Sequence, residues 1–407
     1  MENGKTAMRV LFVHERFGAF GGAEANILAT ARAFRARGHT VGILSGDQTA
    51  KGGEDWAETF ASRFDLAPEN ISGSVGSAAA GFKPDLIYLH KLSNLEAVEK
   101  LLSLDAPCVR MVHDHELYCM RGCKYHYLSR KICTRAFSPY CVLPCGGFAV
   151  RNGSSWPLLK WVSYAEKKRE IELHHQFRRL IVNSSYMKAE LVNNGFLPES
   201  IELHAPVSPE NEAGTRSSFG PRNVIVYAGQ IIRGKGVDVL IESLARVQEP
   251  FECYILGEGS HRPACERLVR RLGLAERVRF CGFVPREELA KYYRDCSVAV
   301  VSSVWPEPFG MVGIEAMRYG LPVVAFDAGG IKEWLIDGYN GYLVPWMDRD
   351  RYAARVGELL RDKLLARSLG ESGRKLAAEI YDFSNYINGL ESLFARLIEE
   401  TRCEVAS

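Results

Sequence analysis

Two carboxylates, Glu307 and Glu315, flank the start of an expected helix and could take part in chemistry there. Helical periodicity begins after Gly310, and five residues of helix carry Glu315 ~7.5 Å along the axis. Backbone N–H groups of the first turn, including those of Met311 and Val312, have no partner within the helix and lie at the positive end of its dipole. Such groups bind anions. The spacing therefore favours a phosphate at the helix start, with a hydroxyl-bearing group held at either side.

The elements that must position these carboxylates form a strand–loop–helix–strand unit. Apolar runs at 298–301 and 322–326 are expected strands, and the prolines beside Glu307 keep its loop extended. This order predicts a βαβ unit of a parallel sheet. Two glutamates separated by seven residues are weak evidence alone, because an exposed loop glutamate and a solvated helix glutamate would show the same spacing.

Three other places could meet the same ligand. Gly21 and Gly22 precede an expected helix over 25–37, where glycine lets the backbone approach a ligand closely. His113 ends an expected strand over 108–113, so it could point into the crevice where ligands of α/β proteins bind, although a histidine there can also be a satisfied edge residue. His115 is the second choice. Arg233 and Lys235 follow the expected strand 223–228, which favours anion binding at its carboxyl end.

The cysteines between residues 117 and 150 form the second chemical signal. Cys119 and Cys123, and Cys141 and Cys145, are two Cys-x-x-x-Cys pairs, and Cys133 lies between them. If these pairs are helical, each shares one helix face, and four thiolates could hold a tetrahedral zinc. Buried thiols in a long loop are the alternative. We therefore treat a structural zinc as a hypothesis, with an iron–sulfur cluster less favoured.

Composition limits the classes of function. The 407 residues suffice for two domains, 47% are hydrophobic, and the formal net charge of +2 argues against nucleic acid as the main partner. No apolar stretch reaches the length of a membrane span, and the leader before the first apolar run is too short and polar for a signal peptide. We expect a cytoplasmic protein. The stretch 158–179 is expected to form a basic, aromatic-rich helix that either contacts an anionic membrane peripherally or packs on the domain.

The segment from Glu307 to Pro345 resembles the donor-binding segment of retaining GT-B glycosyltransferases of family 4, also called glycosyl transferases group 1. The pattern consists of two glutamates, a Gly-Pro strand start, a Gly-Gly-x-x-Glu and an Asn-Gly turn. Its members here are Glu307, Glu315, Gly320, Pro322, Gly329, Gly330, Glu333, Asn340 and Gly341. The resemblance extends from Arg9 to about Phe394.

The resemblance implies a fold of two facing Rossmann-like, doubly wound domains with the active site in the cleft between them. The expected parts are an N-terminal acceptor-side domain over 8–205 with a cysteine-rich insertion at 117–150, a linker at 206–222, a nucleotide-sugar domain over 223–382, and a helix over 383–402 that packs back on the first domain.

The resemblance also implies an activity: transfer of a sugar from a UDP- or GDP-sugar to a glycan or lipid-linked acceptor, with retention and without an obligatory catalytic metal. It implies that Glu315 contacts the ribose, Lys235 the diphosphate, and Glu307 and His113 the sugar. Gly21 and Gly22 would close the opposite wall. One departure is Gln230, which stands where the family carries arginine, and Arg233 is a candidate replacement.

Two alternatives remain at this point. The chain could be another GT-B enzyme, such as a sugar-nucleotide epimerase or a phosphorylase. It could also be a non-catalytic metal-binding scaffold of the same fold, with the cysteines as its working part. The intact Glu307, Glu315 and Lys235 argue against the scaffold, whereas Gln230 mildly favours it.

Overall fold

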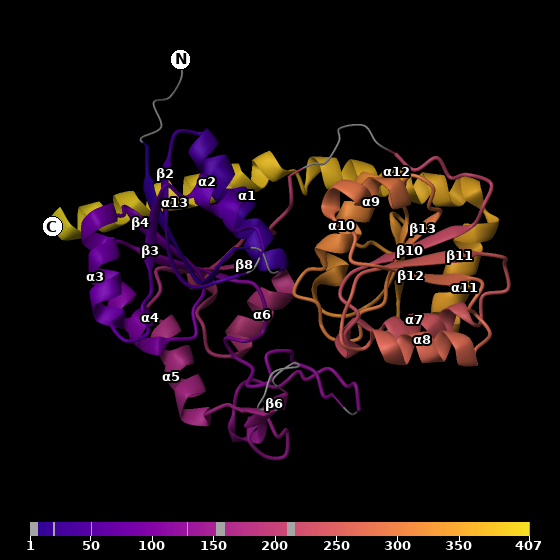
Figure 1. The fold of residues 1–407 in the computed structure, drawn as a ribbon, viewed down its shortest axis with the longest axis horizontal. Coiled ribbons are helices and arrows are strands. Elements are labelled where there is room, and N and C mark those ends of the chain that lie inside the picture. Colours follow the sequence, from indigo (N-terminus) through magenta and orange to yellow (C-terminus); the bar gives the residue numbers. More distant parts are fainter. Residues whose placement is uncertain are drawn as a thin grey trace. The chain divides into compact units, whose positions relative to one another are not determined.

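The computed structural model describes residues 7–18, 21–49, 51–127, 129–151, 159–209 and 216–406. The chain folds into two compact units, each built on a parallel sheet flanked by helices (Figure 1). The first unit comprises Met1–Gly122, Arg135–Pro209 and Phe383–Ser407. The second comprises Cys123–Thr134 and Glu210–Asp382.

The first unit contains a seven-stranded sheet in the order β3-β2-β1-β4-β5-β8-β9. Its strands are β1 (Arg9–Phe17), β2 (Thr40–Gln48), β3 (Ser62–Asp65), β4 (Leu86–Lys91), β5 (Cys108–Val112), β8 (Arg179–Val182) and β9 (Ile201–Leu203). Its helices are α1 (Gly22–Ala36), α2 (Gly53–Thr59), α3 (Ile71–Phe82), α4 (Leu95–Leu102), α5 (Tyr164–His174), α6 (Ser185–Asn193) and α13 (Phe383–Ala406). Strands β4 and β5 are buried along nearly their whole length because helices cover both faces of a parallel sheet.

The second unit contains a six-stranded sheet in the order β12-β11-β10-β13-β14-β15. Its strands are β10 (Val224–Ala228), β11 (Glu252–Leu256), β12 (Val278–Gly282), β13 (Val298–Val301), β14 (Val323–Phe326) and β15 (Gly341–Val344). Its helices are α7 (Val237–Leu244), α8 (Arg262–Arg271), α9 (Arg286–Tyr293), α10 (Met311–Arg318), α11 (Arg349–Arg361) and α12 (Lys363–Glu379). Every strand pair of this sheet is parallel.

The predicted α/β class with two doubly wound parallel sheets is confirmed. The cysteine-rich insertion differs from the expectation, because residues 123–134 of the predicted 117–150 segment fold with the second unit. Part of the predicted linker, 210–215, lies outside the described residues. Among the described helices, none is long and apolar enough to cross a bilayer.

The predicted helix over 158–179 is wrong in extent. Residues 152–158 lie outside the described part, and Leu159–Trp161 forms β7, which pairs antiparallel with β6 (Ala149–Arg151). Helix α5 begins only after Ser163, whose side chain accepts a hydrogen bond from the Glu166 N–H at 3.2 Å. A capping serine stops the helix from extending backward, because its side chain replaces the missing backbone acceptor.

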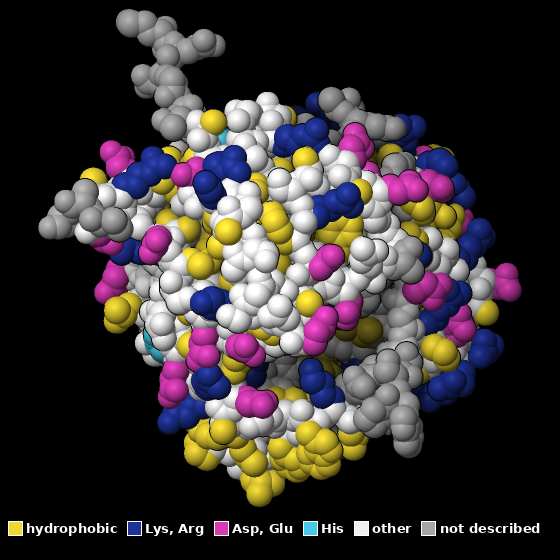
Figure 2. Space-filling view, turned by 60° about the vertical axis from the view of Figure 1, so that its left-hand side comes forward, with side chains coloured by type: hydrophobic (Ala, Val, Ile, Leu, Met, Phe, Trp, Pro, Cys, Tyr) yellow, Lys and Arg dark blue, Asp and Glu magenta, His cyan; other side chains and the backbone are white. Residues whose placement is uncertain are grey.

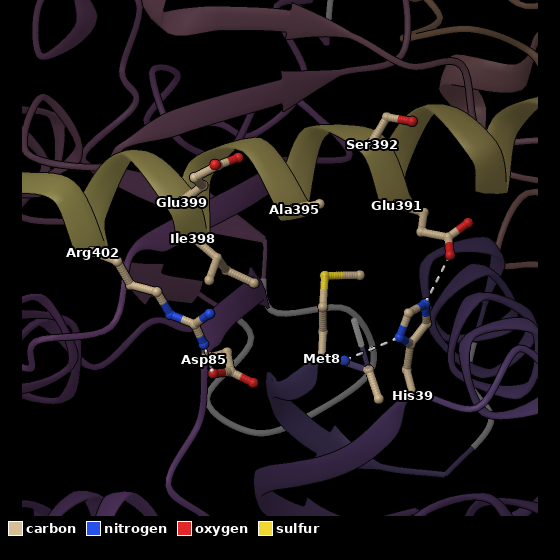
Figure 3. Close-up of a pocket in the computed structure, with 10 residues that line it drawn as sticks. Met8, His39, Asp85, Glu391, Ser392, Ala395, Ile398, Glu399 and Arg402 are labelled. Carbon is tan, nitrogen blue, oxygen red and sulfur yellow. Dashed lines mark hydrogen bonds and ion pairs between the residues drawn. The ribbon is translucent and has the colours of Figure 1, made fainter. Parts of the chain in front are cut away.

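Helix α13 packs on the amino end of the first sheet (Figure 3). Glu391 of this helix is buried and contacts Arg37 at 2.7 Å and His39 Nε2 at 3.0 Å. His39 Nδ1 accepts from the Met8 N–H at 3.2 Å, so its Nε2 carries the proton that is donated to Glu391. A cavity of about 520 Å³ lies beside this contact, between α13 and the start of β1. The cavity lies at the amino end of the first sheet, opposite the end at which the histidines of that sheet lie.

Candidate active site

Glu307 is the centre of a buried polar cluster in the second unit. It is 5% exposed, and its Oε1 accepts from Lys235 Nζ at 2.6 Å and from Trp305 Nε1 at 3.1 Å. The Ser303 hydroxyl donates to the same oxygen. The ammonium of Lys235 also lies 5.1 Å from the centroid of the Trp305 ring. Lys235 and Glu307 are thus held together, although 72 residues separate them in sequence.

The electrostatics of this cluster keep Glu307 ionised. Burial raises the pKa of Glu307, but Lys235 and the hydrogen bonds from Ser303 and Trp305 together outweigh it, so the pKa stays below its usual value. A buried carboxylate is stable only when it is paired and hydrogen-bonded, as here. The cluster is a fixed anion–cation pair that could orient hydroxyl groups and a phosphate of a ligand.

Two loops interlock to form this cluster. The carbonyl of Gly234, after β10, accepts from the N–H groups of Val304 and Trp305 at 2.9 and 3.0 Å. Gly236 has a φ of 66°, and a side chain there would begin 2.1 Å from the carbonyl oxygen of Ser302. Only glycine fits a left-handed conformation with so close a neighbour. The loops after β10 and β13, neighbouring strands of the sheet, therefore meet at its carboxyl edge.

Helix α10 begins at the position where the sequence predicts an anion-binding site. Gly310 caps the helix in a left-handed conformation with a φ of 89°, and Met311 and Val312 form its first turn. Glu315 is half-buried in the same helix. The N–H groups of the first turn start directly after the loop that carries Glu307, as predicted. Asn340, another member of the motif, is fully buried and bonds to backbone at 336 and 334, so its role is structural.

The basic loop before α7 includes Arg233 as well as Lys235. Arg233 Nε donates to the carbonyl of Tyr127 at 3.1 Å, and its guanidinium lies 5.0 Å from the Tyr127 ring centroid. Gln230 is exposed, and its carbonyl accepts from the hydroxyl of Tyr227 at 3.0 Å. The structure thus places Arg233 in the same loop as Lys235, held by a segment from elsewhere in the chain.

The first unit brings three histidines together at the carboxyl ends of adjacent strands. His14 lies in β1, His90 in β4, and His113 directly follows β5. His90 Nδ1 and His113 Nε2 are 2.9 Å apart, and the two rings stack with centroids 5.2 Å apart. His113 therefore lies in a histidine cluster of one sheet edge, and is not an isolated edge residue.

Both stacked histidines are neutral at neutral pH. Burial, followed by the nearby basic groups of His14, Arg110 and Lys91, lowers the pKa of His113 to about 3. Burial and His113 together hold the pKa of His90 well below its usual value. A neutral imidazole offers one N–H donor and one acceptor, so one ring can donate to the other across the 2.9 Å contact.

Gly21 and Gly22 stand at the start of α1, as predicted, and Glu24 joins them to the histidines. The Gly21 N–H donates to Glu24 Oε2 at 2.9 Å, while Glu24 Oε1 lies 3.3 Å from His14 Nε2. Sequence reasoning missed His14, His90 and Glu24. The signal that could have found them was a histidine near the end of each expected strand. His115, the second choice, is 1% exposed and bonds the Tyr118 hydroxyl at 2.7 Å, which indicates a packing role.

The four cysteines predicted as zinc ligands do not converge. Among the described residues, no group of three or more Cys, His, Asp or Glu side chains is placed to hold a metal ion. The expected helical pairs are absent because residues 119–123 form turns and 141–145 follow a short 3-10 turn (Pro139–Cys141). Cys123 also folds with the second unit, whereas Cys119, Cys141 and Cys145 belong to the first. The proposed ligand set is therefore not assembled in this structure, and metal content itself stays a prediction.

Comparison with known families identifies both halves of the chain. The family described as Glycosyltransferase Family 4 matches residues 20–204, and the family described as Glycosyl transferases group 1 matches residues 210–376. These two matches together include every strand of the two parallel sheets except β1.

Individual relatives share less of the chain. A D-inositol 3-phosphate glycosyltransferase 2 of Catenulispora acidiphila is 33% identical over 55% of this chain and 57% of its own length. A GDP-mannose-dependent alpha-(1-6)-phosphatidylinositol monomannoside mannosyltransferase of Mycolicibacterium smegmatis is 32% identical over 40% of this chain and 45% of its own. An uncharacterised glycosyltransferase of Methanocaldococcus jannaschii is 28% identical over 59% of this chain. The matches span no more than 63% of the length of these relatives.

Solved structures share the fold. The Anabaena protein Alr3699/HepE, in complex with UDP and glucose, has a TM-score of 0.72 at 20% identity and matches 96% of this chain and all of its own. Sucrose-phosphate synthase from Thermosynechococcus elongatus has a TM-score of 0.70 at 18% identity, over 96% of this chain and 99% of its own.

Proposed function

We propose that this chain, which carries the family 4 and group 1 glycosyltransferase domains of a GT-B protein, transfers a sugar from a nucleotide-sugar donor to a glycan or lipid-linked acceptor. The observation that carries the proposal is the buried Lys235–Glu307 pair beside the start of α10. A cation, an oriented carboxylate and unpartnered N–H groups are the chemistry that a diphosphate attached to a sugar requires.

In the proposed step, an acceptor hydroxyl oxygen bonds to the anomeric carbon of the donor sugar. The bond between that carbon and the diphosphate oxygen breaks, and its electron pair stays on the diphosphate. The hydroxyl proton leaves with the released nucleoside diphosphate. Negative charge therefore grows on the diphosphate, and in this proposal Lys235 and the first N–H groups of α10 would stabilise it.

We propose the remaining roles on the strength of the family resemblance. Glu315 lies one turn into α10, where it would hold the ribose hydroxyls, and Glu307 would hold the sugar. His113, neutral and supported by His90, would offer a hydrogen bond to the transferred sugar from the first unit. We include retention of the anomeric configuration in the proposal, on the strength of the family resemblance. Proton NMR of the first-formed product, through its anomeric coupling constant, tests it.

The donor base is tested by binding. Structural neighbours include a complex with UDP, whereas one sequence relative is named for GDP-mannose, so UDP and GDP are the probes to compare. We expect one of them to raise the melting temperature, since a ligand that binds only the native state stabilises it. Glu315→Ala should weaken that binding about tenfold or more, the effect of losing a hydrogen bond to a charged group. An unchanged Kd in calorimetry would contradict the ribose assignment.

Turnover separates transfer from the other GT-B reactions. We expect release of nucleoside diphosphate from the matching nucleotide-sugar only when a saccharide or lipid-linked acceptor is added. Release without any acceptor, together with a free sugar product, would instead indicate an epimerase. Dependence on inorganic phosphate would indicate a phosphorylase.

We also propose a peripheral contact with an anionic membrane, at a surface that overlaps the start of the stretch 158–179 expected from sequence but lies before helix α5. Leu143 and Trp161 are each 72% exposed, and Leu159 is 51% exposed, all in the first unit around β6 and β7. Hydrophobic side chains gather at the lower edge of Figure 2, the end at which Figure 1 labels β6. The first-unit parts of this stretch, residues 117–122 and 135–165, contain four Lys or Arg and no Asp or Glu. Exposed Trp and Leu beside positive charge suit an anionic lipid surface.

Sedimentation with vesicles tests the membrane proposal. Wild-type protein should bind vesicles that contain phosphatidylglycerol and should bind phosphatidylcholine vesicles weakly. Trp161→Ser should reduce the bound fraction, whereas Leu364→Ser, a change at a 78% exposed leucine of the second unit, should not. Equal binding of the two variants would rule out this surface.

A further inference from the structure

Residues 123–134 interrupt the first unit in sequence but fold with the second, and we call this segment the arm. It is a small antiparallel hairpin in which Tyr125 bridges to Ile132. Backbone hydrogen bonds from His126 to Lys131 at 3.0 Å and from Cys133 to Lys124 at 2.8 Å hold its two strands together. The arm is therefore a formed element.

The arm is anchored in the core of the second unit. Tyr125 is 5% exposed and belongs to the hydrophobic cluster that includes Ile231 and Val237, which lie on either side of the basic loop. Cys123 packs against the same cluster. A buried tyrosine contributes large apolar area, so this contact fixes the arm beside the loop that carries Lys235.

An ion pair ties the arm to the first turn of α7. Both terminal nitrogens of Arg130 contact the two carboxylate oxygens of Asp238, one of them at 3.2 Å. Burial raises the pKa of Asp238, but Arg130 and then His261, at 3.4 Å, outweigh it and lower the pKa. Both side chains are mostly buried, with 11% and 19% of their areas exposed. A bidentate arginine–carboxylate pair fixes orientation as well as distance.

A second contact holds the basic loop itself. The Tyr127 carbonyl accepts from Arg233 Nε, and the Tyr127 ring lies under the guanidinium. Because Nε is occupied, the terminal nitrogens of Arg233 are limited to a narrow range of directions. Arg233 is two residues from Lys235, and Asp238 is three residues beyond it. The arm thus contacts the basic loop on both sides of Lys235.

We propose that the arm is a positioning element for the donor diphosphate, in which Arg130, through Asp238, and Tyr127, through Arg233, hold the basic loop in its binding conformation. This inference rests on the proposed function, because it assumes that the loop binds the diphosphate of the donor. It assigns to residues 123–134 of the cysteine-rich insertion a role in donor binding. Arg130 is a positioning residue, since it acts on the ligand only through the loop.

Calorimetry with UDP or GDP, whichever the wild-type protein binds more tightly, tests the proposal. Arg130→Ala should raise the Kd about fivefold or more. Lys131→Ala is the matched control, because it removes one positive charge from an exposed neighbour in the same hairpin and should leave the Kd unchanged. The double variant Arg130→Ala/Asp238→Ala should bind no more weakly than Asp238→Ala alone, since both changes break one contact.

Hydrogen exchange separates positioning from general destabilisation. Amides of residues 229–238 should exchange faster in Arg130→Ala than in the control, while those of β13 and β14 should not change. If Arg130→Ala does not fold, Arg130→Lys keeps the charge, loses the bidentate geometry and should give an intermediate Kd. A wild-type Kd in folded Arg130→Ala or Arg130→Lys would overturn the inference. Failure of the wild type itself to bind either nucleotide would count against the proposed function instead.

Discussion

At the scale of single residues, the ion pair between Lys235 and Glu307 contributes both to the stability of the loops and to the proposed catalysis. Removing one partner leaves the other buried and uncompensated, which costs more than an exposed pair contributes. The carboxylate keeps two other donors, Ser303 and Trp305, so the fold of the loop should survive the loss of the lysine. A substitution that removes the ammonium of Lys235 should therefore change catalysis without unfolding the loop.

We predict that Lys235→Ala lowers kcat more than it raises KM for the donor. Charge on the diphosphate grows as the glycosidic bond breaks, and interactions that strengthen in the transition state are lost from kcat. Steady-state kinetics with the matched nucleotide-sugar measures both constants, and Arg246→Ala, at a half-exposed arginine of the same unit, is the control. A rise in KM with intact kcat would make Lys235 a binding residue only.

The buried histidines should make stability depend on pH. The folded-state pKa of His113 is lowered to about 3, so the unfolded chain binds the proton first as the pH falls below ~6.5. Its stabilising contribution is complete above pH ~6.5 and declines steadily down to the folded pKa. At pH 5 the loss amounts to about 2 kcal/mol relative to pH 7.

His113→Gln should remove this part of the pH dependence. We expect the difference in free energy of unfolding between pH 7 and pH 5 to shrink by about 2 kcal/mol in the variant, because glutamine does not titrate. Urea denaturation at the two pH values measures it. If the difference is the same in both proteins, His113 titrates normally and is not held neutral by its surroundings.

At the scale of elements, α13 depends on one carboxylate for its polar attachment. Glu391 is 4% exposed and contacts His39 (Figure 3) and Arg37, both of the loop between α1 and β2. Glu391→Ala should lower the free energy of unfolding by about 1–3 kcal/mol, since it leaves the buried His39 N–H without an acceptor. Glu399→Ala, an exposed change in the same helix, should have little effect in the same urea titration. Equal stability of the two variants would show that apolar contacts alone hold the helix.

The loop elements that form the candidate site are fixed by glycine as much as by charge. Gly236 and Gly329 both have positive φ, and a side chain at either position would meet backbone of the loop between β13 and α10 at less than 2.5 Å. The loops after β10, β13 and β14 can approach one another only because these positions lack a side chain. Precise placement of Lys235 against Glu307 is a consequence of that close approach.

At the scale of the whole molecule, neither unit is continuous in sequence. The first unit is completed by α13, which buries Ile387, Leu390 and Phe394 completely. Fully burying such side chains contributes about 1.5–3 kcal/mol each, and a whole domain is stable by only about 5–15 kcal/mol. We therefore predict that the first unit needs the last helix in order to fold.

A chain that ends at Asp382 should therefore lose the first unit while keeping the second. We expect its circular dichroism signal to melt in two steps or to start partly unfolded, and the amides of β1 and β4 to lose protection from hydrogen exchange. Amides of β10 and β13 should remain protected, which serves as the internal control. Full protection of β1 and β4 in the shortened chain would contradict this dependence.

Local sequence patterns are sufficient to predict the backbone around each part of the candidate site. The positions of Glu307, Glu315, Gly310 and Lys235 at strand ends and a helix start follow from apolar runs, glycines and prolines, which fix backbone conformation over a few residues. The two parallel sheets were predictable for the same reason, because strands alternate with helices along the chain. The resemblance to the family pattern then indicated which ligands these positions are expected to bind.

Contacts between residues that are far apart in sequence could be known only from the tertiary structure. His14, His90 and His113 come together because β1, β4 and β5 are neighbours in the sheet, an order that strand periodicity does not specify. The cysteine pairs suggested a metal site because their spacing fits a helix. In the structure these residues form turns, and residues 123–134 fold with the second unit. Local spacing predicts backbone conformation, whereas long-range contacts depend on which buried surfaces fit one another, and that is settled by packing of the whole chain.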